Sequence, residues 1–218
     1  MIYTIPQNPT KQKILEIAAD LFAEKGFTET SLRELAKAVG VKASSIYNYF
    51  PSKSSILEYM LEDYSSNNTD IFAERNVSRI LSENPSAEGI MECLQLSFPQ
   101  ERMEYYLKVL CVLLQEQLRN PIASSYMSEH VILRAERNTK SIIDTLKELG
   151  IFSQNTDHDY WVKVTSSLFY TFSGRMMLGI GDNTPGFTGM GMVDMLRRTF
   201  EIMFEKCAVA NSGAAESV

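Results

Sequence analysis

A run of hydroxyl, amide and cationic side chains marks the part of this sequence that could bind another molecule. From Lys42 to Phe50 the chain reads Lys-Ala-Ser-Ser-Ile-Tyr-Asn-Tyr-Phe. Ile46 and Phe50 lie four positions apart, so they can share the inner face of a short helix. The polar side chains are then left for the outer face, and hydroxyls, an amide and an ammonium bond phosphates and base edges. The run therefore predicts contact with nucleic acid.

The residues just before this run predict the element that holds it. Leu35 to Val41 reads Leu-Ala-Lys-Ala-Val-Gly-Val, which fits two short helices joined by a tight turn. The alanine lets the helices approach closely, Gly40 permits a left-handed turn, and Val41 fills the corner. This is the pattern of a helix-turn-helix, whose second helix meets base edges in the major groove through its N-terminal residues.

Residues that start and stop helices place another helix before the pair. An apolar stripe from Ile14 to Phe22 predicts a first helix, with Thr10 as its N-cap and Gly26 as its stop. A capping box, Ser-Leu-Arg-Glu, begins the second helix at Ser31. The second and third helices then form the helix-turn-helix.

The pattern stays helical to near the end of the chain. The third helix is expected to end before Pro51, and Ser52 caps a fourth. Further helices are predicted over roughly 87–98, 101–119, 122–149, 157–181 and 190–209. Sustained alternation of period two is not found, so the predicted fold class is all-α. Its parts are a three-helix helix-turn-helix domain over 1–60, a larger helical bundle over 61–209 and a disordered tail over 210–218.

Charge is distributed unevenly along the chain. Residues 1–60 hold seven Lys or Arg and six Asp or Glu, whereas the remainder holds 14 and 21, which gives the net charge of −6. A nearly neutral head on an acidic body is compatible with DNA binding, because the local placement of cations matters more than the total. The balance argues against a protein that coats nucleic acid without specificity.

Metal, cofactor and membrane sites are not expected. Cys93, Cys111 and Cys207 are widely spaced in apolar surroundings, and with only two histidines the sequence gives no zinc pattern. The N-terminus lacks the apolar core of a signal peptide, and the longest apolar run is too short to cross a membrane. A cytoplasmic protein that needs no cofactor is therefore predicted.

The segment from Ile14 to Met60 resembles the DNA-binding domain of the tetracycline-repressor (TetR) family. That family's pattern is an apolar helix ending LFxxxGF, then a threonine, then xxIAxxxGVxxxxxYxYFxxKxxL. The residues that match it here are Leu21, Phe22, Gly26, Phe27, Thr30, Leu35, Ala36, Gly40, Val41, Tyr47, Tyr49, Phe50, Lys53 and Leu57. The match covers about 47 of the 218 residues, and the rest of the chain agrees with the family only in length and helicity.

The resemblance implies a set of DNA contacts. The predicted residues are Thr30, Lys42, Ser44, Ser45, Tyr47, Asn48, Tyr49 and Lys53. Thr30, Tyr47 and Lys53 are expected at phosphates, and Lys42, Ser44, Ser45 and Asn48 in or near the groove. Tyr49 is equally compatible with a core position, and Ser45 and Asn48 with plain solvent exposure. Many members have serine where Lys42 stands and glycine where Ser44 stands, so the contact set departs from the common one.

The resemblance also implies a homodimer and a small-molecule pocket in the second domain. The last two helices are rich in apolar side chains and are expected to pair with those of a second copy, which places two heads on a palindromic double-stranded DNA operator one turn apart. Candidate pocket residues for an unspecified effector are Tyr105, Tyr106, Gln115, Tyr126, His130, Trp161, Tyr170 and Arg175. Each is also compatible with an ordinary core or dimer contact.

Three functional hypotheses follow from these expectations. The first is a dimeric repressor that a small molecule releases from DNA. The second is a DNA-binding regulator of the same fold that a protein partner controls. The third is a helical enzyme, although the sequence holds no HExxH, GxSxG or Walker motif.

Overall fold

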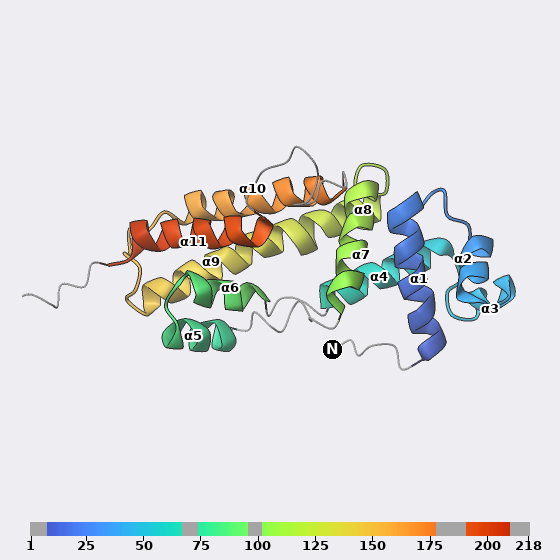
Figure 1. Cartoon of the computed structure of the whole chain (residues 1–218), viewed down its shortest axis with the longest axis horizontal. Coiled ribbons are helices and arrows are strands. Elements are labelled where there is room, and N and C mark those ends of the chain that lie inside the picture. Colours follow the sequence, from blue (N-terminus) through green and yellow to red (C-terminus); the bar gives the residue numbers. More distant parts are fainter. Residues whose placement is uncertain (1–7, 67–73, 96–101, 178–190, 210–218) are drawn as a thin grey trace, which may run out of the picture. The chain divides into compact units, whose positions relative to one another are not determined.

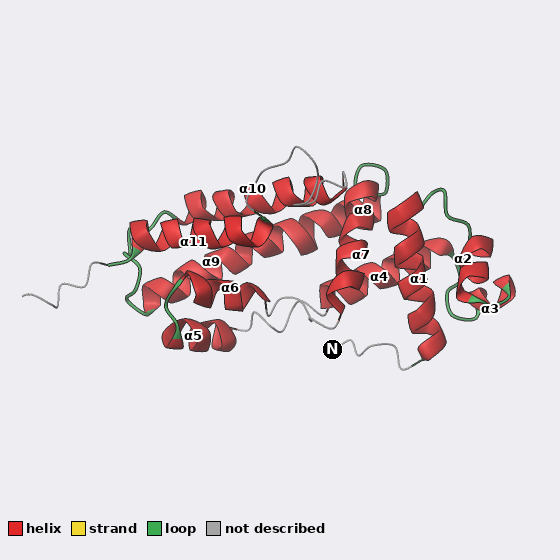
Figure 2. Cartoon of the chain, in the orientation of Figure 1, coloured by secondary structure: helices red, strands yellow, loops and turns green. Residues whose placement is uncertain are grey.

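The computed structural model of the chain describes residues 8–66, 74–95, 102–177 and 191–209 (Figure 1). Every regular element in these ranges is a helix, and the only β-type contact described is one antiparallel bridge between Phe152 and Ala208 (Figure 2). The predicted all-α class is confirmed. Within the same ranges, no helix is both long and apolar enough to span a bilayer. The predicted tail lies outside the described residues.

The helices follow one another along the chain with short connections. They are α1 (Pro9–Lys25), α2 (Leu32–Val39), α3 (Ala43–Tyr47), α4 (Lys53–Ser66), α5 (Glu74–Glu83), α6 (Ala87–Gln95), α7 (Met103–Glu116), α8 (Pro121–Tyr126), the π-helix η2 (Met127–Ile132), α9 (Leu133–Glu148), α10 (His158–Met177) and α11 (Met192–Cys207). Two features differ from the sequence prediction. The helix α5 was not predicted, and the single helix expected over 122–149 is interrupted by η2.

Contacts between Cα atoms divide the chain into two compact units. Unit 1 contains Met1–Asp70, Phe98–Leu133 and Ser173–Gly179. Unit 2 contains Ile71–Ser97, Arg134–Phe172 and Ile180–Val218. The helix-turn-helix therefore belongs to the same unit as α7 and α8, while α5, α6, α11 and most of α9 and α10 form the other.

The start of α1 corrects one predicted cap. Asn8, not Thr10, is the N-cap, and its Oδ1 accepts from the backbone N–H of Thr10 at 3.0 Å and of Lys11 at 3.1 Å. The reason is Pro9, which suits the first helical position because it has no N–H to leave unsatisfied and its φ is already helical. The helix ends as predicted at Gly26, whose φ is 92°.

The caps of α2 agree with the prediction, whereas α3 is shorter than expected. Ser31 Oγ accepts from the backbone N–H of Glu34 at 3.1 Å. Gly40 adopts the left-handed conformation with φ 83° and donates to the Ala36 carbonyl at 3.0 Å. Helix α3 ends at Tyr47 instead of reaching Phe50, and its N-cap position has no side-chain acceptor because a lysine occupies it.

Unit 1 joins the first helices to α7 through polar and apolar contacts. Helix α1 packs on α7, α2 and α4. Lys108 Nζ of α7 lies 2.6 Å from Asp20 Oδ1 of α1, and Gln115 Nε2 donates to the backbone oxygen of Ala23 at 3.0 Å. Helix α7 is buried as its apolar sequence predicted, although Leu107 is exposed.

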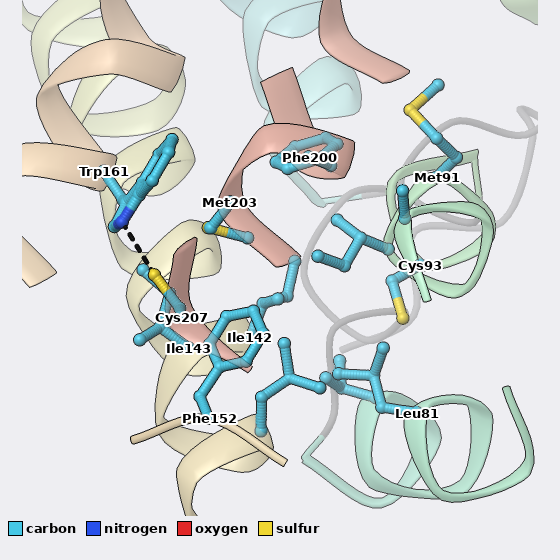
Figure 3. Packing of buried hydrophobic residues seen from close by; sticks show 14 of the residues in the cluster. Leu81, Met91, Cys93, Ile142, Ile143, Phe152, Trp161, Phe200, Met203 and Cys207 are labelled. Carbon is cyan, nitrogen blue, oxygen red and sulfur yellow. Dashed lines mark hydrogen bonds between the residues drawn. The ribbon is translucent and has the colours of Figure 1, made fainter. Parts of the chain in front are cut away.

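Unit 2 is built around one apolar core (Figure 3). Its fully or nearly fully buried members include Leu81, Ile143, Phe152 and Met203, which come from α5, α9, the segment after α9 and α11. At Gly89 the backbone of α6 approaches the preceding turn so closely that a Cβ would lie 2.0 Å from the Asn84 carbonyl oxygen.

Candidate nucleic-acid interface

Helix α3 has a buried side and an exposed side, as its spacing predicts. Ile46 is fully buried and Phe50, just after the helix, is 2% exposed. Tyr47 between them is 56% exposed. The other predicted groove residues divide into exposed and half-buried ones, namely Lys42, Ser44 and Asn48 in the first group and Ser45 and Tyr49 in the second. Their contacts with DNA stay a prediction.

Side chains of α1 and α4 brace the C-terminal end of α3. The Phe50 ring packs edge-on against Tyr59 of α4, with centroids 5.8 Å apart. Lys11 Nζ of α1 lies 3.7 Å from the Tyr59 ring centroid and 5.3 Å from that of Phe50, a cation–π arrangement. Burial lowers the pKa of Lys11, and the charge of Glu62 partly opposes this shift. The orientation of α3 is therefore fixed from both sides.

Exposed cations flank the exposed side of α3. Arg33 and Lys37 of α2 are exposed, as is Lys42 at the start of α3. Lys25 pairs instead with Glu34, which raises the pKa of Lys25 and lowers that of Glu34, mainly through their hydrogen bond. Cations on one helix pair suit the phosphate backbone beside a groove.

Two of the predicted phosphate contacts bond within the chain. Thr30 is only 1% exposed, and its hydroxyl donates to the Gly26 carbonyl at 2.9 Å. Lys53 Nζ donates to the carbonyls of Phe27, Thr28 and Thr30. Sequence reasoning did not anticipate these bonds, because a motif position does not reveal what a side chain bonds inside the fold.

Residues 14–60 match the family model described as bacterial regulatory proteins of the tetR family. Through this domain the chain belongs to the tetR family. The matched segment of the tetR domain runs from α1 to α4, so it contains all of α2 and α3 and the residues that hold them.

Curated relatives resemble the chain in this tetR domain. One is an HTH-type transcriptional regulator of Bacillus subtilis, YttP, which is 42% identical over 55 residues, 25% of this chain and 27% of YttP. Another is IcaR, the negative transcriptional regulator of the biofilm operon icaADBC in Staphylococcus aureus, 43% identical over 60 residues. That match covers 26% of this chain and 32% of IcaR, so the chain aligns with about a third of these relatives or less.

Solved structures of tetR-type proteins share the fold over nearly the whole chain. A transcriptional regulator from Saccharomonospora viridis, solved with choline, has a TM-score of 0.62 at 22% identity, covering 93% of this chain and 100% of that one. The ketosteroid regulator KstR2 of Mycobacterium tuberculosis has a TM-score of 0.58 at 19% identity, with 94% and 98% covered. At such identities the likeness shows the fold alone.

A buried ion pair links α4 of the tetR domain to α7. Arg102 Nη1, just before α7, lies 2.9 Å from Asp63 Oδ2 of α4, with side chains 11% and 1% exposed. Burial lowers the pKa of Arg102, but Asp63, Tyr106 and Tyr105 more than offset this, so the pKa is raised. The Arg102 guanidinium also lies 4.4 Å from the Tyr105 ring centroid and donates to the Tyr106 hydroxyl at 3.2 Å.

This pair was not predicted from the sequence. Asp63 and Arg102 are far apart along the chain, and neither belongs to the tetR pattern. The one hint is their setting, because each is a charged residue beside apolar and aromatic ones. Tyr105 lies against the same pair, and burial raises the pKa of its phenol well above the ordinary value. Its hydroxyl is buried without a hydrogen-bond partner among the described residues.

The candidate pocket residues are divided between the two units. In unit 1, the Tyr105 and Tyr106 rings lie 5.4 Å apart, the Tyr126 and His130 rings lie 4.8 Å apart, and Gln115 bonds to α1. In unit 2, Trp161 is a core residue that donates to Cys207 Sγ at 3.1 Å, and Tyr170 is exposed. The Arg175 side chain lies outside the described part of the structure.

The hollows described in unit 2 are lined by other residues. One, of about 590 Å³, lies between α9 and the start of α10 and contains Asp144, Lys147 and His158. Lys147 Nζ donates to the Thr156 carbonyl at 2.9 Å and lies 3.1 Å from His158 Nδ1. The other is an open depression on α10 around Tyr160 and Leu168. The pocket prediction therefore remains untested by these hollows.

Proposed function

We propose that this protein is a sequence-specific DNA-binding transcriptional regulator. The observation that carries the proposal is the two-sided α3, whose Ile46 is buried while Tyr47 and Asn48 are exposed at the end of a braced tetR helix-turn-helix. Exposed hydroxyl, amide and ammonium groups on such a helix are suited to bases and phosphates. The matched relatives are regulators and not enzymes, so the enzyme hypothesis gains no support from them.

We propose that the protein binds DNA as a homodimer through α10 and α11. In the single chain these helices expose large apolar side chains to solvent, which are Tyr160, Tyr170, Val193 and Ile202. A second copy would cover them, and a symmetric dimer would present two copies of α3 to two half-sites about 34–36 Å apart. A palindromic operator is the DNA that matches this symmetry.

We further propose that a small molecule controls binding, with repression as the mode. The contact between α4 and α7 supports control, because Arg102 joins the last helix of the tetR domain to a buried helix of unit 1. A ligand that favoured a different placement of α4 would shift the protein toward a form that binds DNA less well. The choline-bound neighbour supports a small ligand, and IcaR, a negative regulator, supports repression.

Selection from random double-stranded DNA by the purified full-length protein tests the proposal. The expected result is an enriched palindrome with half-sites about one helical turn apart. Asn48→Ala serves as the matched variant, because Asn48 is exposed and its loss should change the selected sequence without unfolding the chain. Absence of any enriched sequence at near-physiological salt would contradict sequence-specific binding.

Sedimentation of the same protein tests the dimer. Ile202→Glu places a charge on the exposed side of α11 and is expected to yield monomers, whereas Glu201→Gln beside it should leave the dimer intact. A wild-type protein that sediments as a monomer at micromolar concentration would contradict the proposed assembly.

A further inference from the structure

We propose that Lys53 is a positioning residue of the tetR domain, whose ammonium ties the turn between α1 and α2 to the start of α4 and does not contact a phosphate. The inference rests on the proposed DNA-binding function and concerns how its reading surface is built. Nζ lies 2.6 Å from the Phe27 carbonyl oxygen, 3.0 Å from that of Thr28 and 2.8 Å from that of Thr30.

The number of donors supports this role. An ammonium has three N–H groups and no acceptor, so three carbonyl oxygens occupy all of them. The Phe27 ring centroid lies 4.6 Å from Nζ and adds a cation–π contact. A phosphate oxygen would have to displace one of these carbonyls, and the displaced carbonyl would then need a new donor.

The position of the charge in the fold explains why the arrangement is stable. Lys53 is the first residue of α4, and the positive end of a helix dipole disfavours a cation there. The three carbonyl dipoles offset that repulsion. The turn lies between two helices, where no helical hydrogen-bond ladder satisfies its carbonyls, so the lysine and the turn complete each other.

The same contacts fix where α2 begins. Thr30 donates its hydroxyl to Gly26 and accepts from Lys53 through its carbonyl. The next residue, Ser31, caps α2 through the Glu34 N–H. Helix α2 in turn packs on α3. Release of the ammonium is therefore expected to loosen the start of α2 and, through it, the placement of the DNA-reading helix.

Arginine at position 53 separates the two roles. Arginine binds phosphate at least as well as lysine, but its planar fork cannot direct three N–H groups from one atom at three convergent carbonyls. The full-length protein without DNA is measured first, as Lys53→Arg, Lys53→Met and the control Lys37→Met, whose lysine is exposed on α2. The readouts are the melting temperature and hydrogen exchange at the Glu34 and Leu35 amides.

The expected result is that both Lys53 variants exchange these amides faster and melt about 3–8 °C lower, while Lys37→Met does neither. With operator DNA, Lys53→Arg should bind roughly tenfold more weakly, with a salt slope like that of the wild type. If Lys53→Arg instead matches Lys37→Met in exchange and melting, the proposal is overturned. It is also overturned if Lys53→Met lowers the salt slope by about 0.9, the value for one lost phosphate contact.

A failure of the proposed function would be distinguishable from a failure of this inference. Wild-type protein that selects no DNA sequence contradicts sequence-specific binding. The comparison of Lys53→Arg with Lys37→Met is made without DNA, so it still decides whether Lys53 holds the turn.

Discussion

Unit 1 and unit 2 are stabilised by different kinds of contact. In unit 1, directional polar bonds join helices that are distant in sequence, such as Arg102 to Asp63, Gln115 to Ala23 and Lys53 to the turn before α2. In unit 2, the helices meet mainly through apolar side chains around Phe152 and Met203 (Figure 3). Directional bonds specify geometry, whereas apolar packing supplies stability and tolerates exchange of similar side chains. The part proposed to meet DNA in a fixed register is built in the first way.

The comparisons with known proteins agree with this difference. Relatives are 42–43% identical within the tetR domain, whereas the two named structures that match nearly the whole chain are 22% identical or less. Polar bonds and base contacts need particular residue types. An apolar core can keep its fold through many changes of sequence, provided that volume and pattern are retained.

The largest effect on stability is expected from Arg102→Met in unit 1. The substitution leaves the Asp63 carboxylate, 1% exposed, without its cation, which should cost about 3–5 kcal/mol of unfolding free energy. Urea unfolding measures the loss. Asp63→Asn combined with Arg102→Met should recover part of it.

A control for Arg102 exists in unit 2. Arg79 pairs with Glu83 at 3.2 Å, and both side chains are more than half exposed. Arg79→Met should change the unfolding free energy by less than about 1 kcal/mol. Equal costs for the two arginines would break the comparison between the units.

Gly89→Ala is the exception expected in unit 2, because backbone geometry and not side-chain volume sets its cost. The new Cβ would lie 2.0 Å from the Asn84 carbonyl oxygen, so α6 or the turn before it must move. A loss of about 1–3 kcal/mol is expected. Thermal unfolding of Gly89→Ala and of Glu92→Ala, an exposed position on α6, measures the difference. Equal stability would mean that the turn yields freely.

Tyr47→Ala should affect binding without affecting the fold. The side chain is 56% exposed, so stability should stay within about 0.5 kcal/mol of the wild type. Affinity for all DNA sequences is expected to fall roughly tenfold if the tyrosine contacts a phosphate. Fluorescence anisotropy with the selected operator and with scrambled DNA measures both affinities. A loss confined to the operator would assign Tyr47 to base reading.

Met203→Leu should have the smallest effect although Met203 is fully buried. Leucine has a similar volume, and an apolar core that relies on packing should accept it for less than about 1.5 kcal/mol. Urea unfolding alongside Arg102→Met gives the sharpest form of the comparison. A cost for Met203→Leu as large as that of Arg102→Met would show that unit 2 also depends on exact fit.

Local sequence rules predicted the helices best where one residue type decides the outcome. The Ser31 cap and the left-handed Gly40 were predicted from residue type alone. The competition between Asn8 and Thr10 was misjudged because both residues cap well and Pro9 decided between them. Helix α5 was missed although Val77, Ile80 and Leu81 have helical spacing.

Features that depend on the meeting of distant segments could not be predicted. The Arg102–Asp63 pair joins elements whose contact the sequence does not specify. The π-helix η2 differs from an α-helix only in which carbonyl each N–H meets, and the apolar pattern does not report this. Of the predicted DNA-contact residues, α3 presents several to solvent, whereas the bonds of Thr30 and Lys53 became visible only in the fold.

The bond between Trp161 and Cys207 gives the chain a built-in optical reporter. Trp161 is the only tryptophan, it is 6% exposed, and its indole N–H points at the Cys207 sulfur 3.1 Å away (Figure 3). A buried indole emits at short wavelength, and a thiol in contact quenches it. Separation of α10 from α11 should therefore brighten the emission and shift it to the red, without any attached dye. Adding a small molecule and recording this one spectrum would show whether it disturbs the core of unit 2.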